Sequence, residues 1–133
     1  MLTYRLVDSL PSDVAKNIVT EYPNGVKSPA YRKRIEDYVD AGHGACWLRR
    51  PEIAAIVLDS WRHFDAVRYR LHAWVIMPNH VHLVVQTIEP NDLAAAVNGW
   101  KSFSARRIND LLRRRGGLWQ REYWDRFIRN EEH

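Results

Sequence analysis

The chain has 133 residues, enough for one hydrophobic core and too few for two, so we expect a single domain over residues 1–133. Its one cysteine excludes a disulfide framework and a cysteine-based zinc site, and no apolar run approaches a membrane span, so we expect a cytoplasmic protein. The formal net charge of +4 comes entirely from residues 101–133, which hold nine basic and five acidic residues, and a basic field of this kind attracts polyanions.

The first half of the chain reads as one strand followed by three helices. Residues 2–7 alternate between polar and apolar side chains, as a strand does, whereas apolar residues then recur at helical spacing. Ser12 and Ser28 stand where helix N-caps are expected. The helices are predicted over residues 12–22, 28–42 and 51–66.

The second half begins with a predicted hairpin and continues with a basic helix. Residues 68–76 and 80–86 are rich in β-branched and aromatic residues and are joined by a short Met-Pro-Asn turn, which predicts an antiparallel hairpin. A long helix follows over residues 91–117 and stops at its final glycines, and residues 118–129 again look extended. The outline is an α+β domain in which helices cover one face of a small antiparallel sheet.

His80 and His82 are the most informative pair of residues in the chain. Successive side chains of a strand alternate between its faces, so both histidines point to one face while Val81 and Leu83 point to the other. Two neutral imidazoles about 7 Å apart along a strand can share one divalent ion. The spacing alone is also compatible with a structural role, in which each imidazole hydrogen-bonds to a neighbouring chain segment.

The histidine pair belongs to the first of three segments that carry a family resemblance, HAWVIMPNHVHLVVQ (72–86), WKSFSARRIN (100–109) and LWQREYWDRFIRNEEH (118–133). Together these segments resemble the REP-associated tyrosine transposases, which belong to the HUH superfamily of single-strand DNA transposases and nucleases. The resemblance covers nearly the whole chain, and three segments in combination are far more specific than two spaced histidines.

The resemblance implies a ferredoxin-like or RRM-like HUH domain that acts in DNA transposition. In such a domain His80 and His82 bind Mg²⁺ or Mn²⁺. A tyrosine then attacks the scissile phosphate of hairpin-forming single-stranded DNA and leaves a 5′-phosphotyrosine link. The chemistry agrees, because a metal ion withdraws charge from the phosphate that a weakly nucleophilic phenol must attack. The resemblance also allows a homodimer, and we expect no membrane partner.

The residues expected to contact DNA follow the histidine pair, on the basic helix and on the extended segment after it. Lysine and arginine supply phosphate contacts, and exposed aromatic rings that stack on bases contribute about 1–3 kcal/mol per base. For Trp119 core packing is an equally good interpretation, because large aromatic residues are mostly buried. The residues expected at the DNA are Lys101, Ser102, Arg106, Arg107, Arg113, Trp119, Gln120, Arg121, Tyr123 and Arg126.

The resemblance also predicts what this chain lacks. In the family the nucleophilic tyrosine lies on a helix that follows the segment ending here at His133. We therefore expect a chain truncated at its C-terminus, and also at its N-terminus where the first strand is short, that binds DNA but does not cleave it. We expect a further metal ligand to be missing with the tyrosine. Tyr123 is a poor substitute, because a phenol in the wrong place cannot approach the phosphate in line.

Two other functions fit parts of the pattern. The segment HVHLVV is similar to the His-x-His-x-His signature of histidine-triad nucleotide hydrolases, but Val84 stands where the third histidine is needed. A non-catalytic module that binds single-stranded DNA would keep the arginine-rich helix and perform no chemistry. Replacing His80 and His82 separates this module from a metal-dependent protein, because purely electrostatic binding would keep its affinity and its salt dependence.

Overall fold

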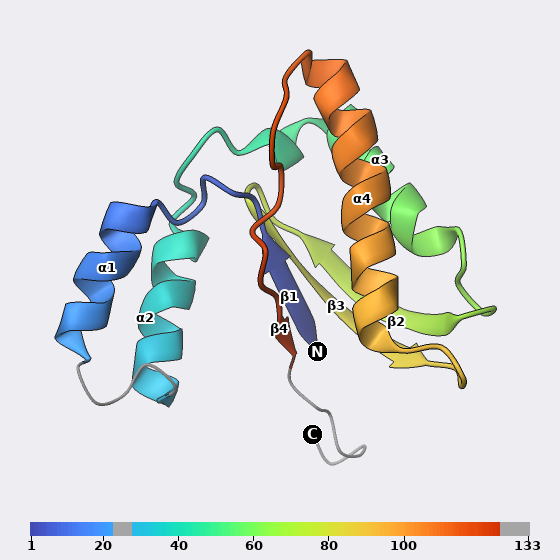
Figure 1. Cartoon of the computed structure of the whole chain (residues 1–133), viewed down its shortest axis with the longest axis horizontal. Helices are drawn as coiled ribbons and strands as arrows, with labels where there is room; N and C mark the ends of the chain where they lie inside the picture. Colours follow the sequence, from blue (N-terminus) through green and yellow to red (C-terminus); the bar gives the residue numbers. More distant parts are fainter. Residues whose placement is uncertain (23–27, 126–133) are drawn as a thin grey trace.

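The computed structural model describes residues 1–22 and 28–125 (Figure 1). Its helices are α1 (Ser12–Glu21), α2 (Pro29–Asp40), α3 (Pro51–Arg62) and α4 (Leu93–Leu112), with a 3-10 helix over Trp47–Arg49. Its strands are β1 (Leu2–Arg5), β2 (Tyr69–Ile76), β3 (His80–Thr87) and β4 (Trp124–Asp125). The predicted α+β class is confirmed. None of the described helices is long and apolar enough to span a bilayer.

The four strands form one antiparallel sheet in the order β2-β3-β1-β4. With α3 and α4 as its connecting helices, the chain follows the β-α-β-β-α-β succession of ferredoxin-like folds. The predicted hairpin is present as β2 and β3. On its other side β3 pairs with β1, which sets Thr3 opposite His82 and Arg5 opposite His80. Residues that face each other in this way share one face of the sheet.

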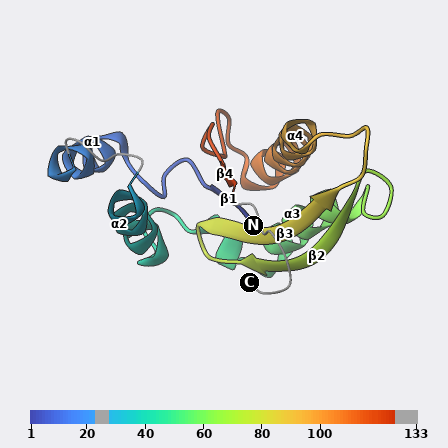
Figure 2. The ribbon, with the colours of Figure 1, turned by 90° about the horizontal axis from the view of Figure 1, so that it is seen from below.

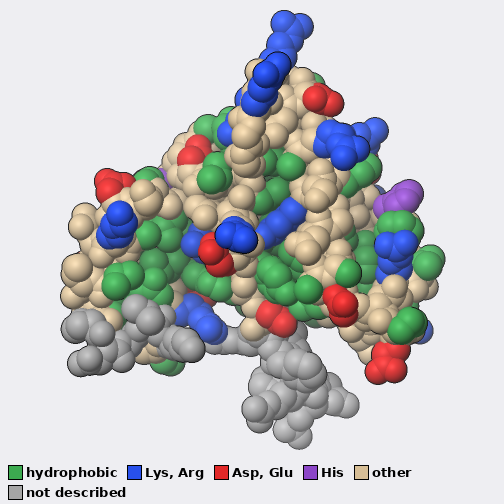
Figure 3. Space-filling model, in the orientation of Figure 1, with side chains coloured by type: hydrophobic (Ala, Val, Ile, Leu, Met, Phe, Trp, Pro, Cys, Tyr) green, Lys and Arg blue, Asp and Glu red, His purple; other side chains and the backbone are tan. Residues whose placement is uncertain are grey.

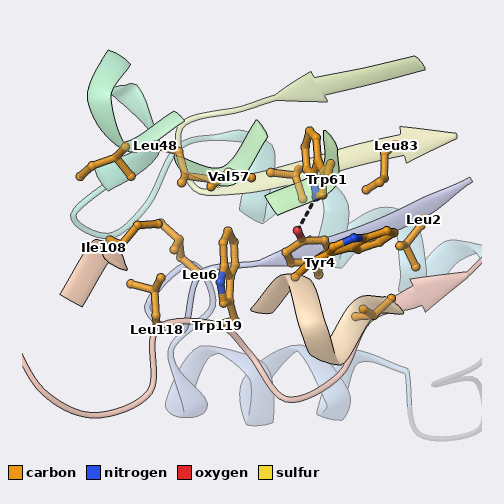
Figure 4. Packing of buried hydrophobic residues seen from close by; sticks show 14 of the residues in the cluster. Leu2, Tyr4, Leu6, Leu48, Val57, Trp61, Leu83, Ile108, Leu118 and Trp119 are labelled. Carbon is orange, nitrogen blue, oxygen red and sulfur yellow. Dashed lines mark hydrogen bonds between the residues drawn. The ribbon is translucent and has the colours of Figure 1, made fainter. Parts of the chain in front are cut away.

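The main core lies between the other face of the sheet and helices α3 and α4, as predicted (Figure 2). Tyr4 of β1 points into it and accepts a hydrogen bond of 2.8 Å from the indole nitrogen of Trp61 on α3 (Figure 4). The indole of Trp100 on α4 donates to the hydroxyl of Tyr69 at 2.9 Å. The polar atoms of these buried aromatic residues are therefore paired. Val81 also enters this core, so its neighbouring histidines face the opposite side of the sheet.

Helices α1 and α2 form a smaller unit beside the sheet (Figures 1 and 2). This unit has a separate hydrophobic cluster, against which Trp124 of β4 packs; the buried members are Leu10, Ile18, Ile35 and Val39. Trp124 pairs with Thr3, which lies on the face of the sheet that carries the histidines. Helix α2 therefore borders that face.

The structure corrects one expected helix cap and shortens two expected helices, of which α3 ends at Arg62 rather than at residue 66. Helix α1 begins directly after Pro11, so Ser12 is its first helical residue and caps nothing, whereas Ser28 accepts a hydrogen bond of 3.2 Å from the amide of Tyr31 as expected. Helix α4 ends at Leu112, before the glycines, because Arg113 adopts a left-handed conformation with φ of 53°. Helix ends depend on local capping contacts that the apolar pattern does not reveal.

The segment after α4 runs along β1 but forms a strand only over Trp124–Asp125. Before that strand, Trp119 forms a single bridge with Leu6, and the amide of Gln120 donates to the carbonyl of Arg5 at 2.8 Å. Residues 126–129 of the predicted extended segment lie outside the described residues.

Candidate metal centre

His80 and His82 of β3 lie next to Asp40, the last residue of α2. These three possible metal ligands form the ligand cluster. Nε2 of His80 lies 3.1 Å from Nε2 of His82 and 3.1 Å from Oδ1 of Asp40. One ligand atom from each residue lies within 4.8 Å of the other two. The expected common orientation of the histidines is confirmed. Two imidazole nitrogens and a carboxylate oxygen in this arrangement could hold one metal ion.

Asn79 determines which nitrogen of His80 carries the proton. Its side-chain nitrogen donates to the carbonyls of Val39 at 3.0 Å and of His43 at 3.1 Å, and a carbonyl can only accept. The amide oxygen of Asn79 must then face Nδ1 of His80, which lies 2.8 Å away and donates its proton. Nε2 of His80 consequently presents a lone pair to the ligand cluster, as a metal-binding imidazole does.

Thr3 orients the second histidine from the neighbouring strand. Its hydroxyl oxygen lies 2.7 Å from Nδ1 of His82. Without a metal ion, Nε2–H of His82 can donate to the lone pair of His80 at 3.1 Å while the hydroxyl of Thr3 donates to Nδ1. When the hydroxyl instead accepts from a protonated Nδ1, Nε2 of His82 is available to a metal ion. Hydrogen bonds of this kind, on the nitrogen that faces away from the metal, hold the rings of ligating histidines in place.

His80 is neutral at neutral pH. The residue is only 2% exposed, and burial is the largest cause that lowers its pKa to about 4, followed by repulsion from His82. The carboxylate of Asp40 acts in the opposite direction and raises this pKa. The lone pair of His80 and the carboxylate of Asp40 therefore face each other at 3.1 Å with no proton between them, an arrangement that a cation would stabilise.

Asp40 is the candidate ligand that sequence reasoning missed. It lies far from the histidines in the chain, on a helix that also carries Glu36 and Asp37, and its spacing does not distinguish it from them. Its position depends on tertiary contacts, above all the hydrogen bond from Asn79 to the carbonyl of Val39, the residue before Asp40. The family resemblance predicts a further metal ligand beyond His133. Within residues 1–22 and 28–125, Asp40 and the two histidines already bring three ligand atoms together.

A cavity of about 120 Å³ opens at the ligand cluster between α2 and the sheet. Besides the cluster, its walls include Thr3 and Arg5 of β1, Glu36 of α2 and Trp124 of β4. A larger cavity of about 340 Å³ lies between α3 and α4 and includes no residue of the cluster. The smaller cavity is the one whose walls carry possible metal ligands and an arginine. Its volume has room for an ion and a group of phosphate size.

The basic helix α4 does not share a face of the sheet with the ligand cluster. Its buried residues enter the main core, so the helix covers the face opposite the histidines (Figure 2). Lys and Arg side chains gather around its C-terminal end, at the top of the molecule in Figure 3. Four of the expected DNA contacts are therefore on the far side of the sheet from the ligand cluster. They are exposed on α4 or directly after it, namely Ser102, Arg106, Arg107 and Arg113.

The ring of Trp119 belongs to the main core, in agreement with the packing alternative. Trp119 is 8% exposed, lies edge-on to Tyr4 with ring centroids 4.7 Å apart, and donates to the hydroxyl of Ser104 at 2.9 Å. It is not available in this structure to stack on a base. Tyr123 is half-buried and keeps part of its surface accessible, whereas Arg126 lies outside the described residues.

Two further expected DNA contacts have structural partners. The ammonium group of Lys101 donates to three successive carbonyls, those of Gln120 at 2.8 Å, Arg121 at 3.2 Å and Glu122 at 3.3 Å. The side-chain amide of Gln120 donates to the carbonyl of Val7 at 2.7 Å. These two side chains tie residues 120–122 to α4 and to the segment that follows β1, while the side chain of Arg121 is exposed.

A model of one protein family, described as "Transposase IS200 like", matches residues 59–130. The matched region is more than half of the chain and contains both histidines and α4, whereas Asp40 and β1 precede it. No curated protein matches the chain.

Proposed function

Since the chain belongs to the family of IS200-like transposases, which act in DNA transposition, we propose that it binds single-stranded DNA at the ligand cluster with the help of a divalent metal ion. The observation that carries this proposal is the approach of three ligand atoms to within 4.8 Å of one another. The hydrogen bonds that His80 and His82 make with Asn79 and Thr3 support it, because they orient both imidazoles before any ligand binds.

The donor set of Asp40, His80 and His82 suits Mn²⁺ and, less well, Mg²⁺. Mg²⁺ prefers oxygen ligands, whereas a mixed set of imidazole and carboxylate is acceptable to Mn²⁺. Three protein ligands leave other coordination positions free for oxygen atoms of the DNA. When bound, the ion would withdraw charge from a phosphate group and make its phosphorus atom easier to attack.

We propose that α4 and the segment after it hold the backbone of a DNA hairpin while a single-stranded flank reaches the ligand cluster. Because the two sites lie on opposite faces of the sheet, bound DNA must pass around an edge of the sheet to contact both. Lys101 and Gln120 are left out because their side chains donate to backbone carbonyls of the chain itself. The proposed backbone contacts are the other exposed or half-exposed members of the expected set, together with one residue outside the described ranges, namely Ser102, Arg106, Arg107, Arg113, Arg121, Tyr123 and Arg126.

We also propose that the 133-residue polypeptide binds DNA without cleaving it. All six tyrosines lie within the described ranges, and none of them lines the cavity at the ligand cluster. Tyr4 is close in the chain to cavity residues but points into the main core, where burial raises the pKa of its hydroxyl. A nicking assay with hairpin DNA and Mn²⁺ should therefore yield no covalent adduct, and a phosphotyrosine adduct would contradict this part of the proposal.

The central test compares DNA binding by the wild type and by a variant in which His80 and His82 are both replaced by alanine. We expect Mn²⁺ to strengthen the binding of hairpin-forming single-stranded DNA by the wild type only. The double variant should lose the Mn²⁺-dependent part and keep the salt-sensitive part that arises from arginines. The matched control is H72A, because His72 is an exposed histidine of β2 outside the cavity. Equal Mn²⁺ dependence in the double variant would overturn the proposal.

A further inference from the structure

We infer that Arg5 forms an anion-binding subsite beside the ligand cluster, where its guanidinium group binds a phosphate oxygen of the DNA backbone. The inference rests on the proposed function and deepens it, because it names the side chain that would recognise the phosphate. Arg5 precedes the region matched by the family model, and it was not among the residues expected from the sequence.

The strand register places Arg5 at the cluster. Arg5 of β1 lies directly opposite His80 of β3, so both side chains are on the same face of the sheet. Both residues line the cavity of about 120 Å³, together with Asp40 and His82. An anion in this cavity would therefore contact the guanidinium group and the ligand cluster at the same time.

Arg5 is half-buried, and one nitrogen of its guanidinium group is buried without a partner. Its Nε–H is buried and makes no hydrogen bond among the described residues. The group lies over the ring of Trp124, with 5.0 Å between its central carbon and the ring centroid. Burial is the largest cause that lowers the pKa of Arg5, and the charge of Glu122 only partly compensates. An unpaired buried donor on a charged group costs free energy, and a bound anion would supply the missing partner.

The charges around the cavity leave room for one further anion. A divalent cation, Arg5 and the N-terminal ammonium group of Met1 bring four positive charges. The cavity-lining carboxylates of Asp40 and Glu36, together with Glu122, whose charge acts on Arg5, supply three negative ones. His80 is neutral and adds no charge. One phosphodiester group would balance the remaining positive charge. The planar fork of an arginine also matches the spacing of two phosphate oxygens, and stacking on Trp124 restricts the orientation of that fork.

The test replaces Arg5 by methionine and by lysine in the 133-residue chain, with R70M as the matched control. Arg70 is exposed on the same face of the sheet but does not line the cavity. We expect R5M to weaken Mn²⁺-dependent binding of a single-stranded oligonucleotide roughly tenfold to hundredfold, as the loss of a charge-assisted hydrogen bond does. R5K, which keeps the charge but not the fork, should be intermediate, and R70M should bind nearly as the wild type does.

Two measurements without DNA separate recognition from a structural role. We expect R5M to bind Mn²⁺ at least as tightly as the wild type, because a neighbouring positive charge has been removed, and to unfold at the same or a higher temperature. The inference is overturned if R5M binds the oligonucleotide as the wild type does. It is also overturned if both R5M and R5K lose thermal stability, because Arg5 would then serve the fold.

Failure of this inference and failure of the proposed function give different results. If the proposed function fails, replacing His80 and His82 leaves Mn²⁺-dependent DNA binding unchanged. If only the inference about Arg5 fails, replacing His80 and His82 abolishes Mn²⁺-dependent DNA binding, whereas R5M binds DNA in the presence of Mn²⁺ as the wild type does.

Discussion

The carboxylate of Asp40 lies 3.1 Å from the imidazole of His80, although Asp40 ends helix α2 and His80 begins strand β3. Both groups are hydrogen-bond acceptors at this contact, because the proton of His80 is on its other ring nitrogen, which donates to Asn79. Two acceptors placed face to face are more stable with a cation between them.

Replacing Asp40 by asparagine should weaken Mn²⁺ binding by at least about tenfold, because a charged ligand becomes a neutral one. The side chain of Asp40 is 54% exposed, so the free energy of unfolding should change by less than about 0.5 kcal/mol. Calorimetric titration with Mn²⁺ and urea denaturation measure the two effects. The control is D37N, since Asp37 lies on the same helix and pairs only with Lys33 among the ion pairs described. Equal weakening in both variants would refute a ligand role for Asp40.

Replacing Asn79 by alanine should weaken both metal binding and the fold. The variant loses the hydrogen bond that sets the proton of His80, which should lower Mn²⁺ affinity about 10- to 100-fold. It also leaves the buried Nδ1–H of His80 without its acceptor, at a cost of about 1–3 kcal/mol in unfolding free energy, whereas the carbonyl of Val39 keeps the backbone amide of Gly42 as a donor. The comparison is T3V, which removes only the hydroxyl beside His82 and should affect metal affinity more than stability. Unchanged Mn²⁺ affinity in N79A would contradict the assigned proton position.

The metal-free protein should lose stability between pH 6.5 and pH 4 partly through His80. Its pKa falls from 6.5 to about 4 on folding, so within this window the unfolded chain binds a proton that the folded chain does not. Stability therefore rises with pH across the window and falls as pH drops through it, by up to about 3 kcal/mol from this one group.

Urea denaturation in the presence of a chelator, repeated from pH 7 to pH 4, tests this dependence on pH. The wild type should show a steeper loss than H80Q, which lacks the titrating group. H72Q serves as the control and should follow the wild type, because His72 is exposed. Identical pH profiles for the wild type and H80Q would show that burial does not hold His80 neutral.

Replacing Arg106 and Arg107 by alanine should weaken DNA binding without changing Mn²⁺ affinity, because both side chains are exposed on α4, across the sheet from the ligand cluster. With hairpin DNA the slope of log affinity against log salt concentration should become shallower by about 0.9 for each phosphate of the duplex stem that the variant no longer neutralises, and by about 0.7 for each phosphate of a single-stranded flank. Filter binding at several salt concentrations measures this slope. R62A is a suitable control, because Arg62 is an exposed residue of α3 that lies over the ring of Trp74. An unchanged slope would remove α4 from the DNA-binding surface.

The sheet and the orientation of the histidines follow from a short-range pattern. In β3 the apolar residues Val81 and Leu83 alternate with His80 and His82, and alternation alone fixes which side chains share a face. The turn before His80 and the β-branched residues on either side of it indicate a hairpin without any tertiary information. For this reason the position of the histidine pair could be predicted from sequence.

The remainder of the candidate site depends on contacts between distant segments. Asp40 reaches the histidines because α2 packs at the border of the sheet, and Arg5 reaches them through strand pairing with His80. Trp119 resembles a base-stacking residue in sequence, yet its ring fills space beside Tyr4. A single sequence does not reveal how a helix docks or which aromatic ring fills a core, because both depend on the three-dimensional packing.

The ligand cluster takes Asp40 from the α1–α2 unit and both histidines from the sheet, two parts of the molecule whose hydrophobic clusters are separate. A bound cation would consequently act as a removable cross-link between these parts. By thermodynamic reciprocity, any interaction that tightens the docking of α2 raises the affinity for the cation, and the cation in turn secures α2. Chelation should thus increase amide hydrogen exchange in the last turn of α2 more than in α4.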